Sequence, residues 1–170
     1  MAFTIMYDRY STAIFSFIRG MKVDEAVAIE LVQDTFIKVI NRIELFDEQK
    51  KFKTWLWTIA RNTVIDYWRK KDAMLFTNPI DESSNIDELS IEYTDAELIL
   101  LDHHVRADIM QCLEQLPLEK RDVLLLRLFS ELSYQDIATA SGFSLGKVKT
   151  IIRRAKIQLR KCLVELGVGK

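Results

Sequence analysis

Apolar residues recur at intervals of three or four along most of the chain, and this spacing marks one face of an α-helix. The clearest run lies between Trp55 and Trp68, where eight apolar or small residues follow that spacing. Folds built from strands need many turn residues, yet the 170 residues include only 5 glycines and 2 prolines. We therefore predict an all-α protein.

The composition changes twice along the chain and predicts two small helical domains. Three amphipathic helices within residues 1–72 can bury their apolar faces against one another. Residues 73–101 are acidic and include a stretch of turn-forming residues around Pro79, so we predict a linker there. Apolar helical spacing resumes in residues 102–170, which form the second predicted domain.

The net charge of −1 and the pI of about 6.2 argue against a nucleic-acid-binding protein, but the charges are segregated. Residues 50–71 hold seven basic side chains and one acid, and residues 142–164 hold seven basic side chains and no acid. Between them, residues 72–102 hold nine acids and no Lys or Arg. Two basic blocks around an acidic middle indicate nucleic acid as a partner.

Several classes of protein lack support in the sequence. It shows no phosphate-binding loop, nucleophile motif or marked pair of carboxylates, so we expect no enzyme, no catalytic residue and no cofactor. Cys112 and Cys162 have no partner at metal-ligand spacing, and we expect two free thiols and no metal site. With no apolar run of about 18 residues and no leader, we expect a cytoplasmic protein without membrane insertion.

The last two predicted helices, residues 133–140 and 144–164, fit a helix-turn-helix. Small or apolar residues stand where the two helices would pack, and a glycine stands where the turn needs a left-handed backbone: Ile137, Ala138, Gly142, Val148 and Ile151. In such motifs the start of the second helix enters the major groove of DNA. The candidate DNA-binding residues on that helix are Ser144, Lys147, Lys149, Thr150, Arg153 and Arg154. A stand-alone transcription regulator or a helical adaptor with an incidental basic helix are the alternatives.

Three motifs in the first domain and three in the second carry a resemblance to a known family. The first-domain motifs are L-V-Q-D-T-F (residues 31–36), F-x-T-W-L-x-x-I-A-R-N (52–62) and D-Y-x-R-K (66–70). The second-domain motifs are L-P-x-E-x-R (116–121), L-S-Y-Q-D-I-A (132–138) and G-K-V-K (146–149). In this order they resemble regions 2 and 4 of bacterial RNA polymerase sigma factors, most closely the extracytoplasmic-function (ECF) group. A stand-alone regulator would leave the first-domain motifs unexplained.

The resemblance implies a sigma factor that binds core RNA polymerase through its β and β′ subunits, recognises promoter DNA and has an anti-sigma factor as a partner. Region 2 would dock on the polymerase through Leu31, Gln33, Asp34 and Phe36. It would open the −10 element through Lys51, Lys53, Trp57, Arg61, Asn62 and Arg69, and region 4 would read the −35 element.

Helical phase adds to this reading of the first domain. It places Gln33 and Asp34 outward, Leu31 and Phe36 partly in the core, and Trp57 as the most exposed aromatic side chain. A linker of about thirty residues spans about 30 Å on average, while the two promoter elements lie about 70 Å apart. We therefore expect the polymerase to hold the domains at promoter spacing, and the free protein to bind promoter DNA poorly.

Overall fold

The computed structural model describes residues 1–75 and 103–168, and within these ranges all regular structure is helical. The first unit, residues 1–75, comprises α1 (Ala2–Gly20), α2 (Glu25–Arg42), the 3-10 turn η1 (Ile43–Leu45) and α3 (Phe52–Leu75). The second unit, residues 103–168, comprises α4 (His103–Glu114), α5 (Leu118–Phe129), α6 (Tyr134–Ser141) and α7 (Leu145–Glu165). The prediction of an all-α protein is confirmed, whereas nearly all of the predicted acidic linker lies outside the described residues.

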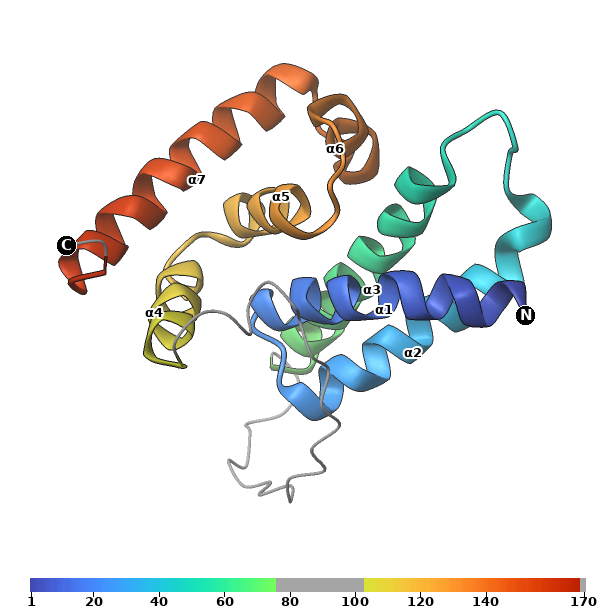
Figure 1. Cartoon of the computed structure of the whole chain (residues 1–170), viewed down its shortest axis with the longest axis horizontal. Helices are drawn as coiled ribbons and strands as arrows, with labels where there is room; N and C mark the ends of the chain where they lie inside the picture. Colours follow the sequence, from blue (N-terminus) through green and yellow to red (C-terminus); the bar gives the residue numbers. More distant parts are fainter. Residues whose placement is uncertain (76–102, 169–170) are drawn as a thin grey trace.

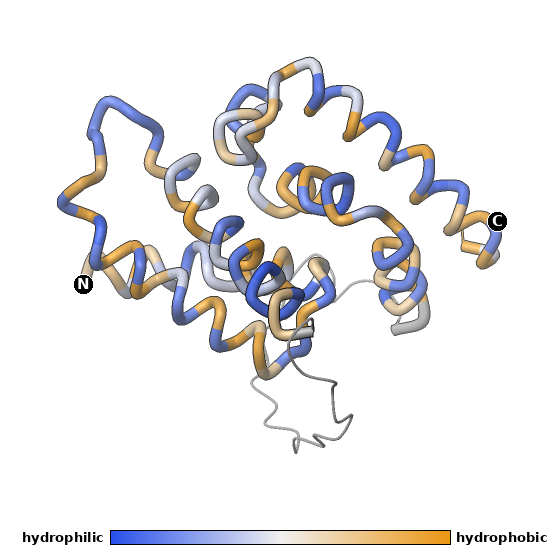
Figure 2. The backbone as a smooth tube through the Cα atoms, turned by 180° about the vertical axis from the view of Figure 1, so that it is seen from behind, coloured by the Kyte–Doolittle hydropathy of each residue, from blue (hydrophilic) through white to orange (hydrophobic). Residues whose placement is uncertain are grey.

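Each helix turns an apolar stripe inward, so that orange and blue segments alternate along the helical tubes in Figure 2. In the first unit, α2 packs against both α1 and α3. In the second unit, α7 lies along α4, α5 and α6. No helix within the described ranges is both long and apolar enough to cross a membrane.

Arg121 fixes the bend between α4 and α5. Its side chain is buried, and it donates hydrogen bonds to the carbonyl oxygens of Leu113, Glu114 and Leu116 at 2.6–2.9 Å. These carbonyls belong to the end of α4 and the segment after it, where the helix itself supplies no donors. The arginine of the L-P-x-E-x-R motif is therefore a structural residue that fixes the angle between α4 and α5.

The two units share one continuous hydrophobic core. In Figure 1, α5 and α6 of the second unit lie beside α1 and α3 of the first, and the contacts between the helices agree. A Cβ atom on Gly20, in α1, would lie only 2.6 Å from a methyl carbon of Leu125, in α5. α5 is consequently buried on two sides, by α7 and by the first unit. The surface between the two units is called the seam below.

A disulfide joins Cys112 in α4 to Cys162 in α7, so the prediction of two free thiols is wrong. Both cysteines are buried, and their Cα atoms lie 5.7 Å apart, within the range that a disulfide bridges. Helical phase alone indicates buried positions at both residues. It does not say that α4 and α7 pack against each other, and that contact brings together residues separated by 50 positions.

Candidate nucleic-acid interface

The helix-turn-helix predicted at α6 and α7 is present. Gly142, between the two helices, has φ of 76°, a left-handed conformation that glycine adopts without strain. The other four predicted packing positions, Ile137, Ala138, Val148 and Ile151, are all buried. Ser133 and Ser144 begin the two helices, and each side-chain oxygen accepts a backbone N–H of the first turn. The motif is thus held by local caps and by its own small core.

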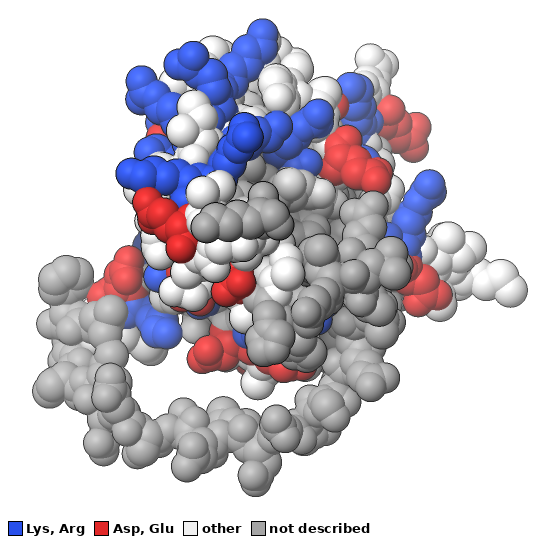
Figure 3. Space-filling view, turned by 60° about the vertical axis from the view of Figure 1, so that its left-hand side comes forward, with Lys and Arg blue, Asp and Glu red and all other residues white. Residues whose placement is uncertain are grey.

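The outward side of α7 carries the basic residues. Lys149, Thr150, Arg153 and Arg154 are exposed, and none forms a side-chain hydrogen bond or ion pair with another described residue. Figure 3 shows Lys and Arg side chains gathered over this helix. Arg and Lys at the start of such a helix can contact both base edges and phosphates. In this structure the surface is therefore accessible to DNA.

The first two residues of the predicted set are already engaged. The Ser144 hydroxyl accepts the Lys147 backbone N–H at 3.2 Å as a helix cap. The Lys147 ammonium lies 3.1 Å from a carboxylate oxygen of Glu119 and 4.0 Å from the centre of the Phe143 ring. Lys147 would have to leave Glu119 to reach a phosphate, whereas Ser144 can still donate its own proton.

The predicted −10 residues lie in α3 and, for Lys51, directly before it. Asn62 and Arg69 are exposed, and Arg69 pairs with Asp66 in its own helix at 3.4 Å. Three others reach across the seam to acids of the second unit. Lys51 Nζ lies 3.0 Å from Asp136, Lys53 Nζ lies 3.4 Å from Glu131, and Arg61 Nε lies 2.7 Å from Asp122.

Trp57 is the sixth predicted −10 residue, and the structure corrects its placement. It was expected to be the most exposed aromatic side chain, but only 1% of its surface is accessible. Its ring packs edge-on against Phe17 of α1, with the ring centres 5.6 Å apart. Helical phase within α3 does not show this contact with α1, nor the second unit that engages Lys53 and Arg61 one turn to either side.

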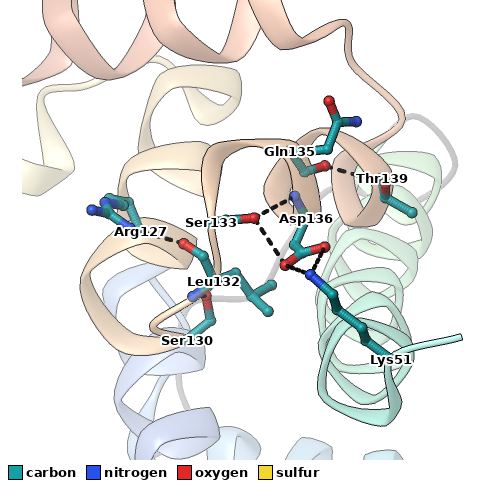
Figure 4. Close-up of polar contacts among 8 residues, drawn as sticks. All are labelled: Lys51, Arg127, Ser130, Leu132, Ser133, Gln135, Asp136 and Thr139. Carbon is teal, nitrogen blue, oxygen red and sulfur yellow. Dashed lines mark hydrogen bonds and ion pairs between the residues drawn. The ribbon is translucent and has the colours of Figure 1, made fainter.

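The electrostatics of the seam centre on Asp122 and Asp136. Burial raises the pKa of the Asp122 carboxyl, and the Arg61 guanidinium beside it opposes that rise. Burial also acts to raise the pKa of Asp136, but hydrogen bonds from Lys51 and Ser133 outweigh it and hold the pKa below its ordinary value. Figure 4 shows Lys51 and Ser133 converging on the Asp136 carboxylate from the two units.

The L-V-Q-D-T-F segment lies in α2 and is divided as helical phase predicted. Leu31 and Phe36 are buried in the core, while Gln33 and Asp34 are exposed. Ile40 continues the apolar spacing of α2, which is typical of a buried position, yet nearly half of its surface is accessible. With Ile37, which is also exposed, Ile40 continues the outward face that begins at Gln33, at positions i, i+4 and i+7. An exposed apolar surface of this kind is typical of a protein-binding site.

A helix-turn-helix whose second helix exposes basic residues without partners in the described ranges, Lys149, Arg153 and Arg154, defines a DNA-binding protein of the helix-turn-helix class. No group of His, Cys, Asp and Glu within the described ranges could hold a metal ion.

Comparison with known proteins gives the family. The family model of Sigma-70 region 2 matches residues 6–74, and that of Sigma-70 region 4 matches residues 106–159. The RNA polymerase sigma factor YlaC of Bacillus subtilis is 34% identical over 92% of this chain and 88% of its own. The ECF RNA polymerase sigma factor SigX of the same species is 32% identical over 94% and 82%. The chain therefore belongs to the sigma-70 family, within its ECF group of RNA polymerase sigma factors.

A solved structure agrees with this assignment. The sigma factor RpoE of Bartonella quintana, in complex with the anti-sigma factor NepR, overlays with a TM-score of 0.74 at 25% identity, covering 95% of this chain and 96% of that one. Both units of the chain take part in this overlay. The stand-alone regulator, which leaves the first-unit motifs unexplained, gains no support, and neither does the adaptor.

Proposed function

We propose that the protein binds core RNA polymerase in the cell interior and directs it to a set of promoters, as a regulatory subunit without chemistry of its own. Residues 1–72 would open the −10 element, and residues 102–170 would read the −35 element. The observation that carries this proposal is the combination of the exposed basic surface of α7 with a region 2 match across the whole first unit.

The −35 element would be read from α7. Lys149, Thr150, Arg153 and Arg154 stand exposed on the first half of the helix, which enters the major groove in this class of motif. Ser144 and Lys147 would contact phosphate at the helix start. Arg160, nearer the end of α7, is expected to meet at most the DNA backbone.

The −10 element would be opened by α3. Asn62 can both donate and accept hydrogen bonds, as a pocket for a flipped base requires, and it is exposed. Lys51, Lys53 and Arg61 would hold the backbone of the separated strand, and Trp57 would offer a ring for stacking. These four residues can act in this way only after the second unit moves away from α3.

The polymerase would dock on the outward face of α2. Gln33 and Asp34 supply the polar contacts, and Ile37 and Ile40 supply apolar area beside them. Leu31 and Phe36 are buried, so they would act by holding the helix in place. Since RpoE is bound to an anti-sigma factor in its solved structure, we also propose an anti-sigma partner for this chain.

Run-off transcription with purified core polymerase on genomic fragments tests the function. The protein should produce promoter-specific transcripts, and Arg153→Ala/Arg154→Ala should reduce them more than tenfold, because each lost base contact costs about 1–3 kcal/mol. Lys156→Ala/Arg160→Ala, on the second half of the same helix, is the matched control and should have a smaller effect. The absence of specific transcripts with the wild-type protein would refute the proposal.

A further inference from the structure

Three ion pairs cross the seam, and each of them occupies a cation proposed to hold the −10 strand. Their acids lie on three successive parts of the second unit: Asp122 in α5, Glu131 in the turn after α5, and Asp136 in α6. These three acids are called the acidic face below. The spaced negative charges of this face meet α3 where a DNA strand would place its phosphates.

The pair between Arg61 and Asp122 is the most enclosed of the three. Only 14% of the Arg61 side chain and 1% of the Asp122 side chain are accessible. The guanidinium also lies 5.8 Å from the centre of the Phe143 ring, in the turn of the helix-turn-helix. Arg61 is therefore held by two elements of the second unit at once, and it cannot reach DNA while the seam is closed.

The turn that carries Glu131 is fixed in shape. Arg127 donates a hydrogen bond to the carbonyl oxygen of Leu132 at 2.9 Å, and the Leu132 N–H donates to the Ser130 hydroxyl at 3.1 Å. Glu131 itself has φ of 55°, which few residues other than glycine adopt. The backbone thus holds Glu131 on the side of the turn from which its carboxylate reaches Lys53.

The covered stripe of α3 is continuous. Lys53, Trp57 and Arg61 stand at i, i+4 and i+8, so they line one face of the helix. Lys53 and Arg61 contact the second unit at the two ends of this stripe, and Trp57 between them is buried. Gly20 and Leu125 add a tight apolar contact elsewhere in the same seam. The closure therefore combines a packed apolar surface with the three ion pairs.

We propose that the acidic face is an internal ligand that takes the place of the −10 DNA strand, so that the free chain blocks its own −10 surface until a partner opens the seam. This inference rests on the proposed function, because it takes α3 as the −10 surface. It adds that the second unit inhibits the first, and it assigns this role to Asp122, Glu131 and Asp136. The α7 surface stays exposed in the closed form, so inhibition is confined to the −10 side.

Glu131→Gln/Asp136→Asn tests the proposal, because it neutralises the two more accessible acids and leaves every proposed DNA contact in place. The matched control is Asp8→Asn/Glu165→Gln, which makes the same chemical changes at exposed positions on α1 and α7. The probe is a short, fluorescein-labelled, single-stranded DNA pool of random sequence, titrated with free protein at low salt.

The seam variant should bind the probe about two- to tenfold more tightly than wild type, since two exposed ion pairs are lost and the open fraction rises by the same factor. The control variant has the same net charge and should bind like wild type. Equal affinities of the seam and control variants would overturn the proposal.

A second variant approaches the seam through its apolar contact. Gly20→Val inserts a branched side chain where even a Cβ would lie 2.6 Å from Leu125, and it changes no charge. It should also raise the affinity for the probe. Far-ultraviolet circular dichroism checks that the helices remain, and an intact variant with wild-type affinity would count against the proposal.

Carbodiimide cross-linking reads the closed form directly, because it couples an amine to a carboxylate that are in contact. In the free wild-type protein, mass spectrometry should find the Lys51–Asp136 or Lys53–Glu131 link, and added core polymerase should abolish it. A free protein without either link refutes the closure even if run-off transcripts appear. Links that form in a protein without transcripts would instead refute the proposed function and leave only the closed fold.

Discussion

The disulfide between Cys112 and Cys162 should contribute a large share of the stability of the chain. It ties the first helix of the second unit to the last, across a sequence separation of 50 residues. Closing a loop of this length lowers the entropy of the unfolded chain by an amount worth about 4 kcal/mol at 25 °C. Both sulfurs are buried, so reduction would also leave two thiols in the core in place of one bond.

For a chain of this size, a loss of about 4 kcal/mol lowers the melting temperature by about 8–16 °C, if both units melt together. The shared core supports a single transition. Differential scanning calorimetry with and without dithiothreitol measures the shift in the wild-type protein. Cys112→Ser/Cys162→Ser should melt near the temperature of the reduced protein and should not respond to the reductant.

Two results would refute this reasoning. The first is an equal melting temperature for oxidised and reduced wild-type protein, with the thiols confirmed by mass spectrometry. The second is a shift of similar size in the double serine variant, which would assign the effect to the reductant itself. A confirmed shift would mean that a reducing cell interior weakens the second unit, since such compartments disfavour disulfides.

Three further predictions concern single positions. Gly142→Ala should lower the free energy of unfolding by about 1–2 kcal/mol, because φ of 76° is strained for alanine. Gly146→Ala inside α7 is the control and should not lower it. Urea denaturation compares the two variants, and equal effects would contradict the left-handed turn. Burial raises the pKa of the Asp122 carboxyl in the folded protein above its ordinary value of 3.8. The folded state therefore binds this proton more tightly than the unfolded state does. The resulting stabilisation is complete below pH 3.8 and is lost as the pH rises through the folded pKa. The stability of wild type relative to Asp122→Asn should therefore fall as the pH is raised, and a pH series of urea melts that shows it rising would contradict the raised pKa. Ile40→Asp should weaken binding to core polymerase at least tenfold in a fluorescence titration, with little change in stability. Ile157→Asp on α7, which is also at an exposed position, should leave the binding intact, and equal losses in both variants would place the docking surface elsewhere.

The elements whose shape is set locally could be predicted from the sequence. Gly142, Ser133 and Ser144 determine where α6 ends and where α6 and α7 begin, and these residues act through their own neighbours in the chain. The buried positions Ile137 and Val148 followed from the same short motif. The outward placement of the α7 cations required only the phase of one helix.

The features that sequence reasoning missed depend on contacts between distant segments. Trp57 lies off the apolar stripe of α3 and is nevertheless buried, with its ring packed against Phe17 of α1. Cys112 and Cys162 meet because α4 packs on α7, which the phase of either helix alone does not reveal. Ile40 continues the apolar spacing of α2 but lies on its outward face, beside the buried Val39. One signal was present in the sequence: the cations of α3 and the acids of the second unit are complementary.

The shared core has a consequence for the synthesis of the protein. The first unit leaves the ribosome before α5 exists, so the side of α3 that carries Lys53 and Arg61 and the neighbourhood of Gly20 have no cover at that stage. Roughly forty more residues must be added before α5 begins, which takes about two to nine seconds at elongation rates of about 5–20 residues per second. During that interval the nascent chain presents both its −10 cations and an apolar patch to the cell. A chaperone, or the polymerase itself, could meet the first unit in an open state that the finished protein adopts only with a partner.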